Sequence, residues 1–549
     1  MPINRDAVQD AQTIARVEAA ARANDISRAV ELARAALSDG LVHPLLLNLR
    51  SHWFLERGRP DAALADLKRA VQLAPMDIFV RNALGLLLVQ LDQRDEAIPL
   101  MRETAQLFPD SAIAQYSLGS ALERTGELDE ARTHHERAVA LDPSFAKPLA
   151  HLADFAQRRS DYAAAKHYAN AALALEPQHY VAHTILAIVA LAEGHVDEAE
   201  TLVTPQLART AETPIDAAVA RRVLGDVRHA QGRYAQAFAA YTESNRQKYE
   251  IHKHQFEKPG STAADYAQWL LDYFKDADPA RWSAKRADAP ADDHGGAKTQ
   301  AFLVGFPRSG TTLLENVLKS HPDVVTLEEK DTFGGLTGLF LVDERGRDML
   351  AGMPGAMLAS QQASYWDRVA QFGAKVRGKV FIDKYPLSSL KLPLVAKLMP
   401  GAKVLFAMRD PRDVVLSCYR RNFAMNTSMF EFLDIARTAR FYAAVQALCA
   451  AYRERLGLDW LQLRHEDLVA DFEVETRRAS DFLGLEWNAA MADFAEHAKR
   501  RTIRTPSSVQ VVRGLNSDGI GVWRHYAREM APALPILAPW IEAYGYPAE

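Results

Sequence analysis

The pattern of apolar and polar residues changes near residue 300. Beyond that point short apolar runs alternate with helical stretches, whereas before it small residues recur every 34 positions. One row of the recurrence consists of Ala29, Ala63, Ala97, Ala131, Ala165 and Ala199. A second row consists of Asn24, Gly58, Asp92, Gly126, Ser160 and Gly194, and a third of Pro75, Pro109, Pro143 and Pro177. Three rows in one register predict a solenoid of stacked helix pairs.

Each row has a structural interpretation. The alanine opens the second helix of a pair, where a small side chain allows close helix approach, and the Gly or Asn before it supplies the turn. Each proline is predicted to start the next pair, where its missing N–H costs nothing. Six units are clear. Gly232 and Ala237 imply a seventh, with a four-residue insertion near residues 211–214.

The pairs Leu84-Gly85 and Leu118-Gly119 resemble the first helix of the tetratricopeptide (TPR) repeat. The resemblance implies a right-handed superhelix whose groove could hold a peptide or protein partner. An oligomer interface is the alternative use. We expect the array to cover residues 1–278, an Ala-, Asp- and Gly-rich linker to cover 279–299, and a second domain to cover 300–549.

The second half reads as an α/β domain. Strands are predicted at residues 301–306, 379–383 and 403–408, with a weaker one at 460–464, and helices opening near Gly310, Leu387, Asp410 and Leu468. This alternation predicts a mainly parallel sheet covered by helices on both faces. Ligands of such sheets bind beyond the carboxyl ends of the strands.

One anion-binding motif follows the first of these strands. The strand leads through Gly305 into the loop and helix start Arg308, Ser309, Gly310, Thr311 and Thr312. Backbone N–H groups of the loop and the helix dipole would converge there on one anion. The two glycines have Walker spacing, but Thr311 replaces the lysine that reaches the β- and γ-phosphates. This argues against a nucleoside triphosphatase, and the positive charge is instead at Arg308.

A second anion site is predicted after residues 403–408. Arg409 leaves the strand, and Ser417 and Arg421, four residues apart, are expected on one face of the following helix. Two phosphate sites indicate a nucleotide phosphorylated at both ends. Taken alone, the Arg-Asp-Pro-Arg run is more often a helix start with a surface ion pair.

The blocks GFPRSGTT and FAMRDPRDVVLS resemble the phosphate loops of the sulfotransferases, most closely the protein-tyrosine sulfotransferases, over about residues 300–549. Together with the repeats they resemble bacterial TPR-sulfotransferases. The resemblance implies 3′-phosphoadenylyl sulfate (PAPS) as donor and no metal. It places Glu329 as general base, with Glu328 as its rival, and Arg308, Lys384 and Ser507 at catalytic positions. The loop SSVQVVRGLN would place Ser508, Gln510, Val511, Arg513 and Asn516 along the nucleotide.

Two positions depart from the family pattern. His465 stands where the family has tyrosine, and Val522 where it has lysine, with Arg524 as a substitute cation. Both positions bear on cofactor affinity.

Composition restricts the partners. The formal net charge is −5, which gives no bulk attraction for nucleic acid or anionic membrane. There are two cysteines, no signal-like N-terminus and no long apolar run, so we expect a cytoplasmic protein without membrane anchor. The seventeen histidines lack the paired spacing of a zinc site.

The sequence therefore predicts a PAPS-dependent O-sulfotransferase acting on a peptide or protein tyrosine. The acceptor could also be a glycan, lipid or small phenol. A P-loop kinase or NTPase, and a TPR scaffold with an inactive nucleotide-binding domain, are the other hypotheses. A homodimer is compatible with the sequence, which does not define the oligomeric state.

Overall fold

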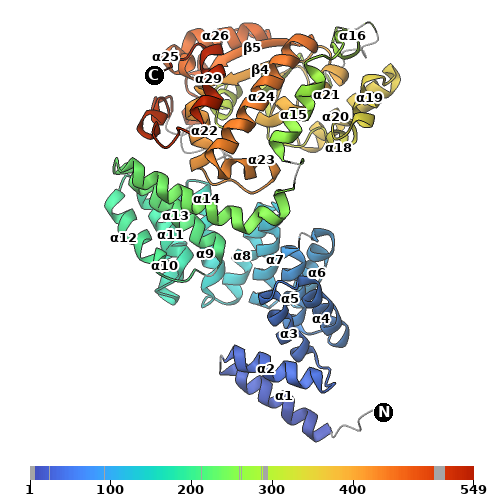
Figure 1. Ribbon diagram of the computed structural model, residues 1–549, viewed down its shortest axis with the longest axis vertical. Coiled ribbons are helices and arrows are strands. Elements are labelled where there is room, and N and C mark those ends of the chain that lie inside the picture. Colours follow the sequence, from blue (N-terminus) through green and yellow to red (C-terminus); the bar gives the residue numbers. More distant parts are fainter. Residues whose placement is uncertain are drawn as a thin grey trace. The chain divides into compact units, whose positions relative to one another are not determined.

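The fold is described from a computed structural model. The structure describes residues 7–548 except 24, 92, 212, 259, 261, 286, 288–294 and 500–513. The chain forms two compact units, residues 1–189 and 190–549 (Figure 1). Within the described residues, no helix combines the length and apolar character that crossing a membrane requires.

The first unit consists of helices that pair in sequence. They are α1 (Ala7–Arg22), α2 (Ile26–Ser38), α3 (Pro44–Glu56), α4 (Pro60–Leu73), α5 (Ile78–Gln90), α6 (Arg94–Leu107), α7 (Ala112–Thr125), α8 (Leu128–Leu141), α9 (Ala146–Arg158), α10 (Tyr162–Leu175) and the start of α11 (Tyr180–Ala192).

The second unit begins with four further long helices. They are α12 (Val196–Leu207), α13 (Pro214–Ala230), α14 (Tyr234–Phe256) and α15 (Ala263–Phe274), followed by the short α16 (Pro279–Trp282). Its five strands are β1 (Thr299–Gly305), β2 (Val324–Glu328), β3 (Val380–Lys384), β4 (Lys403–Met408) and β5 (Asp459–Arg464).

Helices and short 3-10 segments connect the strands. They are α17 (Thr311–Lys319), α18 (Leu336–Phe340), α19 (Glu344–Ala351), α20 (Gly355–Gln371), η1 (Pro386–Lys391), α21 (Leu392–Leu398), α22 (Pro411–Arg420), α23 (Thr427–Phe430), η2 (Glu431–Leu433) and α24 (Ile435–Arg455). After β5 come α25 (His465–Ala470), α26 (Phe472–Leu483), η3 (Ala489–Met491), α27 (Phe494–Lys499), η4 (Val522–Tyr526) and α29 (Leu534–Ala543).

The repeat prediction is confirmed at the level of single side chains. The seven alanines from Ala29 to Ala237 are all fully buried, each on the second helix of a pair. The turns before them at Gly58, Gly126, Ser160, Gly194 and Gly232 all have positive φ. Asn24 and Asp92 of the same row lie outside the described residues.

Two details of the repeat differ from expectation. The prolines do not start helices: each lies two residues beyond the end of α4, α6, α8 or α10, because proline cannot continue the helix it follows. The four-residue insertion is not in the loop near residues 211–214. It lengthens α13 to 17 residues, against 13 in α9, which adds about one turn and keeps the buried face in register.

The five strands form one parallel sheet in the order β2-β3-β1-β4-β5. This confirms the predicted parallel α/β sheet and its four predicted strands. The strand β2 was not predicted, and neither were α18, α19 and α20. The helix expected near Leu468 is divided into α25 and α26.

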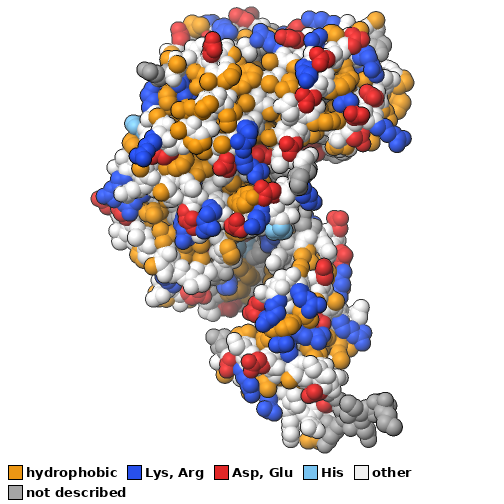
Figure 2. Space-filling view, in the orientation of Figure 1, with side chains coloured by type: hydrophobic (Ala, Val, Ile, Leu, Met, Phe, Trp, Pro, Cys, Tyr) orange, Lys and Arg blue, Asp and Glu red, His pale blue; other side chains and the backbone are white. Residues whose placement is uncertain are grey.

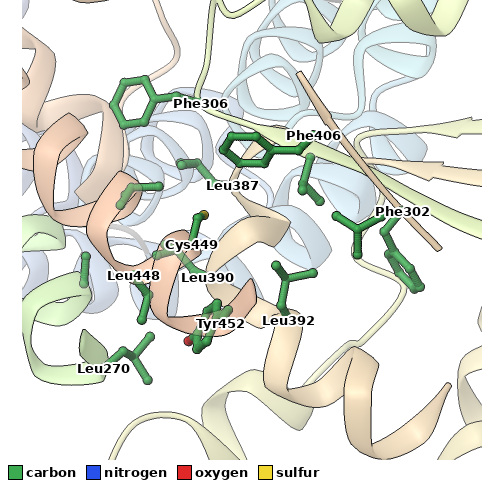
Figure 3. Close-up of a cluster of buried hydrophobic side chains, with 14 of the residues drawn as sticks. Leu270, Phe302, Phe306, Leu387, Leu390, Leu392, Phe406, Leu448, Cys449 and Tyr452 are labelled. Carbon is green, nitrogen blue, oxygen red and sulfur yellow. The ribbon is translucent and has the colours of Figure 1, made fainter. Parts of the chain in front are cut away.

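Apolar side chains cover both faces of the sheet. Phe302, Phe306 and Phe406 belong to one buried cluster with Leu448 and Tyr452 of α24 and Leu270 of α15 (Figure 3). The alternate strand residues, such as Leu303 and Leu405, pack on the other side against α17 and α26. The strands are therefore fixed from both sides, and their carboxyl ends form one edge.

The packing of α13, α14 and α15 bears on the domain boundary. The compact units divide within α11, and Ala237 and Tyr241 of α14 belong to the same core cluster as the sheet. The predicted linker at residues 279–299 marks a change of sequence pattern and stays a prediction as a domain boundary. The last helices of the repeat region pack as part of the α/β unit.

Replacing Ser160 by glycine is expected to stabilise the array by on the order of 0.5 to 1 kcal/mol. Ser160 has φ 59°, where a non-glycine residue costs about 1–2 kcal/mol, and part of this gain is offset by the greater chain entropy of unfolded glycine. Urea unfolding followed by circular dichroism measures the change. The matched control Ser160→Ala keeps the backbone cost and should show no gain; equal stability of all three proteins would contradict the prediction.

Candidate active site

Each of the five strands places a residue of the candidate site at its carboxyl end. β1 leads into the loop with Arg308, β2 ends beside Glu329, and β3 ends at Lys384. β4 and β5 are followed by Arg409 and His465. Parallel pairing brings these ends to one edge of the sheet, so residues from positions 308 to 465 meet there.

The loop after β1 has an unusual backbone. Arg308 has φ 72° and Gly310 has φ 99°. A Cβ on Gly310 would lie 3.1 Å from Nδ1 of His465, so glycine is needed for both conformation and space. The hydroxyl of Ser309 donates to the carbonyl of Phe306 at 2.7 Å and is buried within the loop. Thr311 and Thr312 form the first turn of α17, whose N–H groups have no partner within the helix.

Three guanidinium groups lie close together behind this loop. Nε of Arg308 donates to Oγ of Ser417 at 3.0 Å, and Nη1 of Arg409 donates to the carbonyl of Arg308 at 3.2 Å. Burial, followed by the charges of Arg421 and Arg409, lowers the pKa of Arg308 to about 9. Nε of Arg409 is buried without a hydrogen-bond partner among the described residues. Clustered like charges of this kind favour an anion.

Arg421 does not share a helix face with Ser417 as expected. Helix α22 ends at Arg420, and Arg421 is its C-cap with an extended backbone. Burial lowers the pKa of Arg421, and the negative charge of Asp226 on α13 partly opposes this lowering. Arg421 therefore contributes to the positive field at Arg308 but does not line the pocket.

A carboxylate cluster surrounds Lys384 on the other side of the loop. Its Nζ lies 2.9 Å from Glu329 Oε1, 3.3 Å from Glu328 Oε1 and 3.2 Å from Glu315 Oε2. Lys384 is fully buried, and the carboxylates raise its pKa despite the opposing cost of burial. Burial also raises the pKa of Glu315. The ammonium of Lys384 holds Glu329 in place and is not part of the pocket wall.

Glu329 is the carboxylate that faces the pocket. It has φ 48°, and its N–H donates to the carbonyl of Lys384 at 2.7 Å. Its side chain is 37% exposed, against 19% for Glu328 and 2% for Glu315. Of the three, Glu329 alone lines the pocket. The backbone conformation after β2 decides between the two adjacent carboxylates, which sequence could not.

The pocket encloses about 150 Å³. Its polar wall contains Arg308, Gly310, Thr311, Thr312, Glu329, Arg409, His465 and Asn516. Its apolar wall includes Tyr385, Leu387, Phe423 and Met429, none of which the sequence singled out. These residues belong to connecting segments whose apolar character is shared with the core, so no local signal distinguishes them.

His465 is neutral in this environment. Burial, followed by the charges of Arg409 and Arg308, lowers its pKa to about 3. Its Nδ1 is buried and has no hydrogen-bond partner in the described part of the chain. A neutral imidazole can donate or accept a hydrogen bond at the position where the family has tyrosine.

The segment after residue 513 is attached to α22. Arg409 donates to the carbonyl of Gly519, and Asp413 accepts from the N–H groups of Gly521 at 2.6 Å and Trp523 at 2.9 Å. Arg524 is exposed beside Trp523 and does not line the pocket. Ser507, Ser508, Gln510, Val511 and Arg513 lie outside the described residues, and their roles stay predictions.

Helix α14 supports the segment that carries Phe423 and Met429. Nζ of Lys248 donates to Asn422 Oδ1 at 2.6 Å, and Asn245 donates to the carbonyl of Tyr419 at 3.0 Å. Burial, followed by the charge of Arg222, lowers the pKa of Lys248 to about 7. The last helix pair of the repeat region thus holds one wall of the pocket.

The positive charge of the site is confined to the pocket and does not extend over the surface drawn in Figure 2. On the face drawn in Figure 2, basic and acidic side chains are interspersed over the surface. The arginines of the pocket are mostly buried at the strand ends instead. This distribution fits a small anionic ligand better than an extended polyanion.

Comparison with known proteins matches each of the two parts of the chain to a protein family. Residues 300–489 match the sulfotransferase family, and residues 14–78, 82–144 and 156–222 match the tetratricopeptide repeat. The chain therefore combines TPR repeats with a sulfotransferase-family domain. This confirms the resemblance on which the sequence interpretation depends.

Individual relatives and solved structures each match part of the chain. An uncharacterised protein of Aquifex aeolicus is 25% identical over 44% of this chain and 32% of its own length. The protein-tyrosine sulfotransferase A of Caenorhabditis elegans is 26% identical over 45% of this chain and 66% of its own length. The crystal structure of MamA is 22% identical over 29% of this chain and 92% of that chain, with a TM-score of 0.25. The chain thus spans only part of the length of the Aquifex aeolicus and Caenorhabditis elegans relatives.

The variant Asp383→Asn is expected to gain stability over the native protein as pH rises from 4 to 7. Burial raises the pKa of Asp383 to about 6, although Thr332 and Tyr365 donate to it at 2.7 and 2.9 Å. The folded state then binds more protons than the unfolded state, so stability present below pH 4 is lost through pH 6, by up to about 3 kcal/mol.

Urea unfolding of both proteins at several pH values measures this difference. A difference between variant and native protein that is constant from pH 4 to pH 7 would contradict the assigned pKa of Asp383.

Proposed function

We propose that this protein transfers a sulfuryl group from PAPS to a hydroxyl acceptor, with a peptide or protein tyrosine as acceptor. The observation that carries the proposal is one pocket lined by the buried Arg308 and Arg409, by the N-terminus of α17 and by Glu329, with the charge of Arg421 close to Arg308. This arrangement combines a site for an anionic donor with a base for the acceptor.

The described residues fit a phosphorylated nucleotide. Arg409 and His465 line the same pocket, and among the described residues Nε of Arg409 and Nδ1 of His465 are buried without a hydrogen-bond partner. The first turn of α17 adds backbone donors at Thr311 and Thr312. Ser507 and the residues from Ser508 to Arg513 would complete the nucleotide site by family resemblance.

In the proposed reaction Glu329, Arg308 and Lys384 have different roles. Glu329 accepts the proton of the acceptor hydroxyl, whose oxygen forms a bond to sulfur while the bond from sulfur to the donor phosphate oxygen breaks. The leaving 3′-phosphoadenosine 5′-phosphate keeps the electron pair. Arg308 and the α17 N-terminus stabilise this negative charge, and Lys384 orients Glu329.

An aromatic acceptor is supported by the pocket wall. Tyr385, Phe423 and Met429 lie on the same pocket as Glu329 and offer an apolar surface for a phenol ring. The relatives named protein-tyrosine sulfotransferases point the same way. The TPR repeats support a macromolecular acceptor, because such arrays bind peptides in their grooves.

The variant Glu329→Ala is expected to lose transfer by at least about a hundredfold while binding 3′-phosphoadenosine 5′-phosphate nearly as the native protein does, because the base contacts the acceptor and not the nucleotide. Transfer of radiolabel from PAPS and calorimetric nucleotide titration measure the two properties. Glu328→Gln is the matched control and should keep most activity. Parallel loss of transfer and binding in Glu329→Ala would contradict its role as base.

The acceptor class is tested with lysate from the protein's own source and radiolabelled PAPS. Label recovered as tyrosine O-sulfate after hydrolysis of protein supports the proposal. Label on glycans or small molecules would overturn the acceptor assignment, and magnesium-dependent ATP turnover without sulfuryl transfer would overturn the reaction.

Arg308→Met is expected to separate stability from binding. Removing one of three clustered positive charges should leave the free protein as stable as before or more stable, while nucleotide affinity falls at least about tenfold. Arg412 provides the contrast: it is buried and pairs with Asp410 at 2.8 Å, so Arg412→Met should destabilise by about 3–5 kcal/mol. Unchanged nucleotide affinity in Arg308→Met would contradict its assignment to the anion site.

A further inference from the structure

Three potential metal ligands converge within the first unit. Oε1 of Glu123, near the end of α7, lies 2.8 Å from Nε2 of His135 on α8 and 2.8 Å from Nδ1 of His151 on α9. The two imidazole rings are stacked, with centroids 4.7 Å apart and an interplanar angle of 14°. The three ligand atoms all lie within 4.8 Å of one another. Both rings therefore direct a nitrogen toward the same carboxylate oxygen.

The repeat register shows that these three positions are exceptional. The positions 34 and 68 residues away from His135 are Leu67, Met101, Ala169 and Val203, and all are almost fully buried. Glu123 corresponds to Leu55, Val89, Gln157 and Leu191, and His151 to Leu49, Ala83, Ser117 and Ile185, none of which is charged or a metal-ligating side chain. A buried histidine on this face replaces packing that the other repeats obtain from apolar side chains. Glu123 and His151, which are only half-buried, bring two further potential metal ligands to the same point.

The local packing accommodates the His135 ring closely. A Cβ on Gly119 would lie 2.8 Å from this ring, so the glycine of α7 makes room for it. His135 is fully buried, whereas the side chains of Glu123 and His151 are 20% and 32% exposed. One side of the cluster is thus fixed in the core, and the other is open to solvent for a further ligand.

We propose that Glu123, His135 and His151 bind a divalent transition-metal ion such as Zn²⁺. One carboxylate and two imidazoles with an open fourth position is a ligand set that zinc accepts, at metal–ligand distances of about 2.0–2.2 Å. The carboxylate would withdraw from between the rings, and each ring would present a lone pair, with its proton on the other nitrogen. The hydroxyl of Tyr116, 3.4 Å from His151 Nε2, can orient that ring.

The electrostatic surroundings permit this occupant. The nearby guanidinium of Arg158 lies 2.6 Å from Asp154, which balances its charge. A bound ion would tie α7, α8 and α9 together across two successive repeats. The histidine spacing in sequence does not indicate such a site, because each ligand comes from a different helix.

The test uses the full-length protein and Co²⁺ as a spectroscopic substitute for Zn²⁺. Visible absorption should show one high-affinity site per chain. Glu123→Gln and His151→Ala should weaken binding at least about a hundredfold, and His135→Leu, which restores the residue type of Leu67, should do the same while keeping the core filled. His134→Ala, next to the cluster on α8, is the matched control and should bind like the native protein.

Thermal unfolding provides a second measurement. Zn²⁺ should raise the unfolding temperature of the native protein and of His134→Ala, but not of Glu123→Gln or His151→Ala. Co²⁺ binding that is absent, or equal in all variants, would overturn the proposal and leave the cluster as a hydrogen-bonded network. None of these measurements depends on sulfuryl transfer, so the outcome is independent of the proposed activity.

Discussion

The burial of charged groups at one edge of a parallel sheet is the constraint on which the α/β unit depends. Charges removed from water are costly unless other charges compensate them. Lys384 is compensated internally by three carboxylates. Burial, followed by the charges of Arg421 and Arg409, lowers the pKa of Arg308, and this environment favours an anion from outside. Apolar side chains pack on both faces of the sheet, one layer of which is drawn in Figure 3. The carboxyl ends of the strands therefore meet at one edge, where Arg308, Arg409 and Glu329 line the same pocket.

The repeat region and the site are connected through α14. Its buried Lys248 and Asn245 hold the backbone between Tyr419 and Asn422, from which the chain continues to Phe423 and Met429 on the pocket wall. A helix that the sequence assigns to the repeats therefore belongs physically to the catalytic unit. The last long helix of the repeat pattern thus supports the segment that carries Phe423 and Met429 of the pocket wall.

Departures from a repeat carry information because the repeat defines what packing alone requires. The buried alanines at 34-residue spacing meet the need for close helix approach. Glu123, His135 and His151 depart from an otherwise mostly apolar pattern at positions that converge in space. Ser160 departs in a different way, because it keeps the positive φ of its glycine counterparts without their freedom.

The sequence by itself determined the helix pairs, the parallel sheet and the turn from β1 into α17, because these depend on local spacing and on residues such as the alanine row and Gly310. It also placed Arg308 and Arg409 after strand ends, whereas Glu329 was singled out only by family resemblance. Only the tertiary structure decided that Glu329 and not Glu328 faces the pocket, that Glu315 holds Lys384, that Arg421 lies beyond the end of α22, and that α14 packs with the sheet. These features depend on backbone direction at strand and helix ends and on contacts between distant segments, which periodicity in a sequence does not encode.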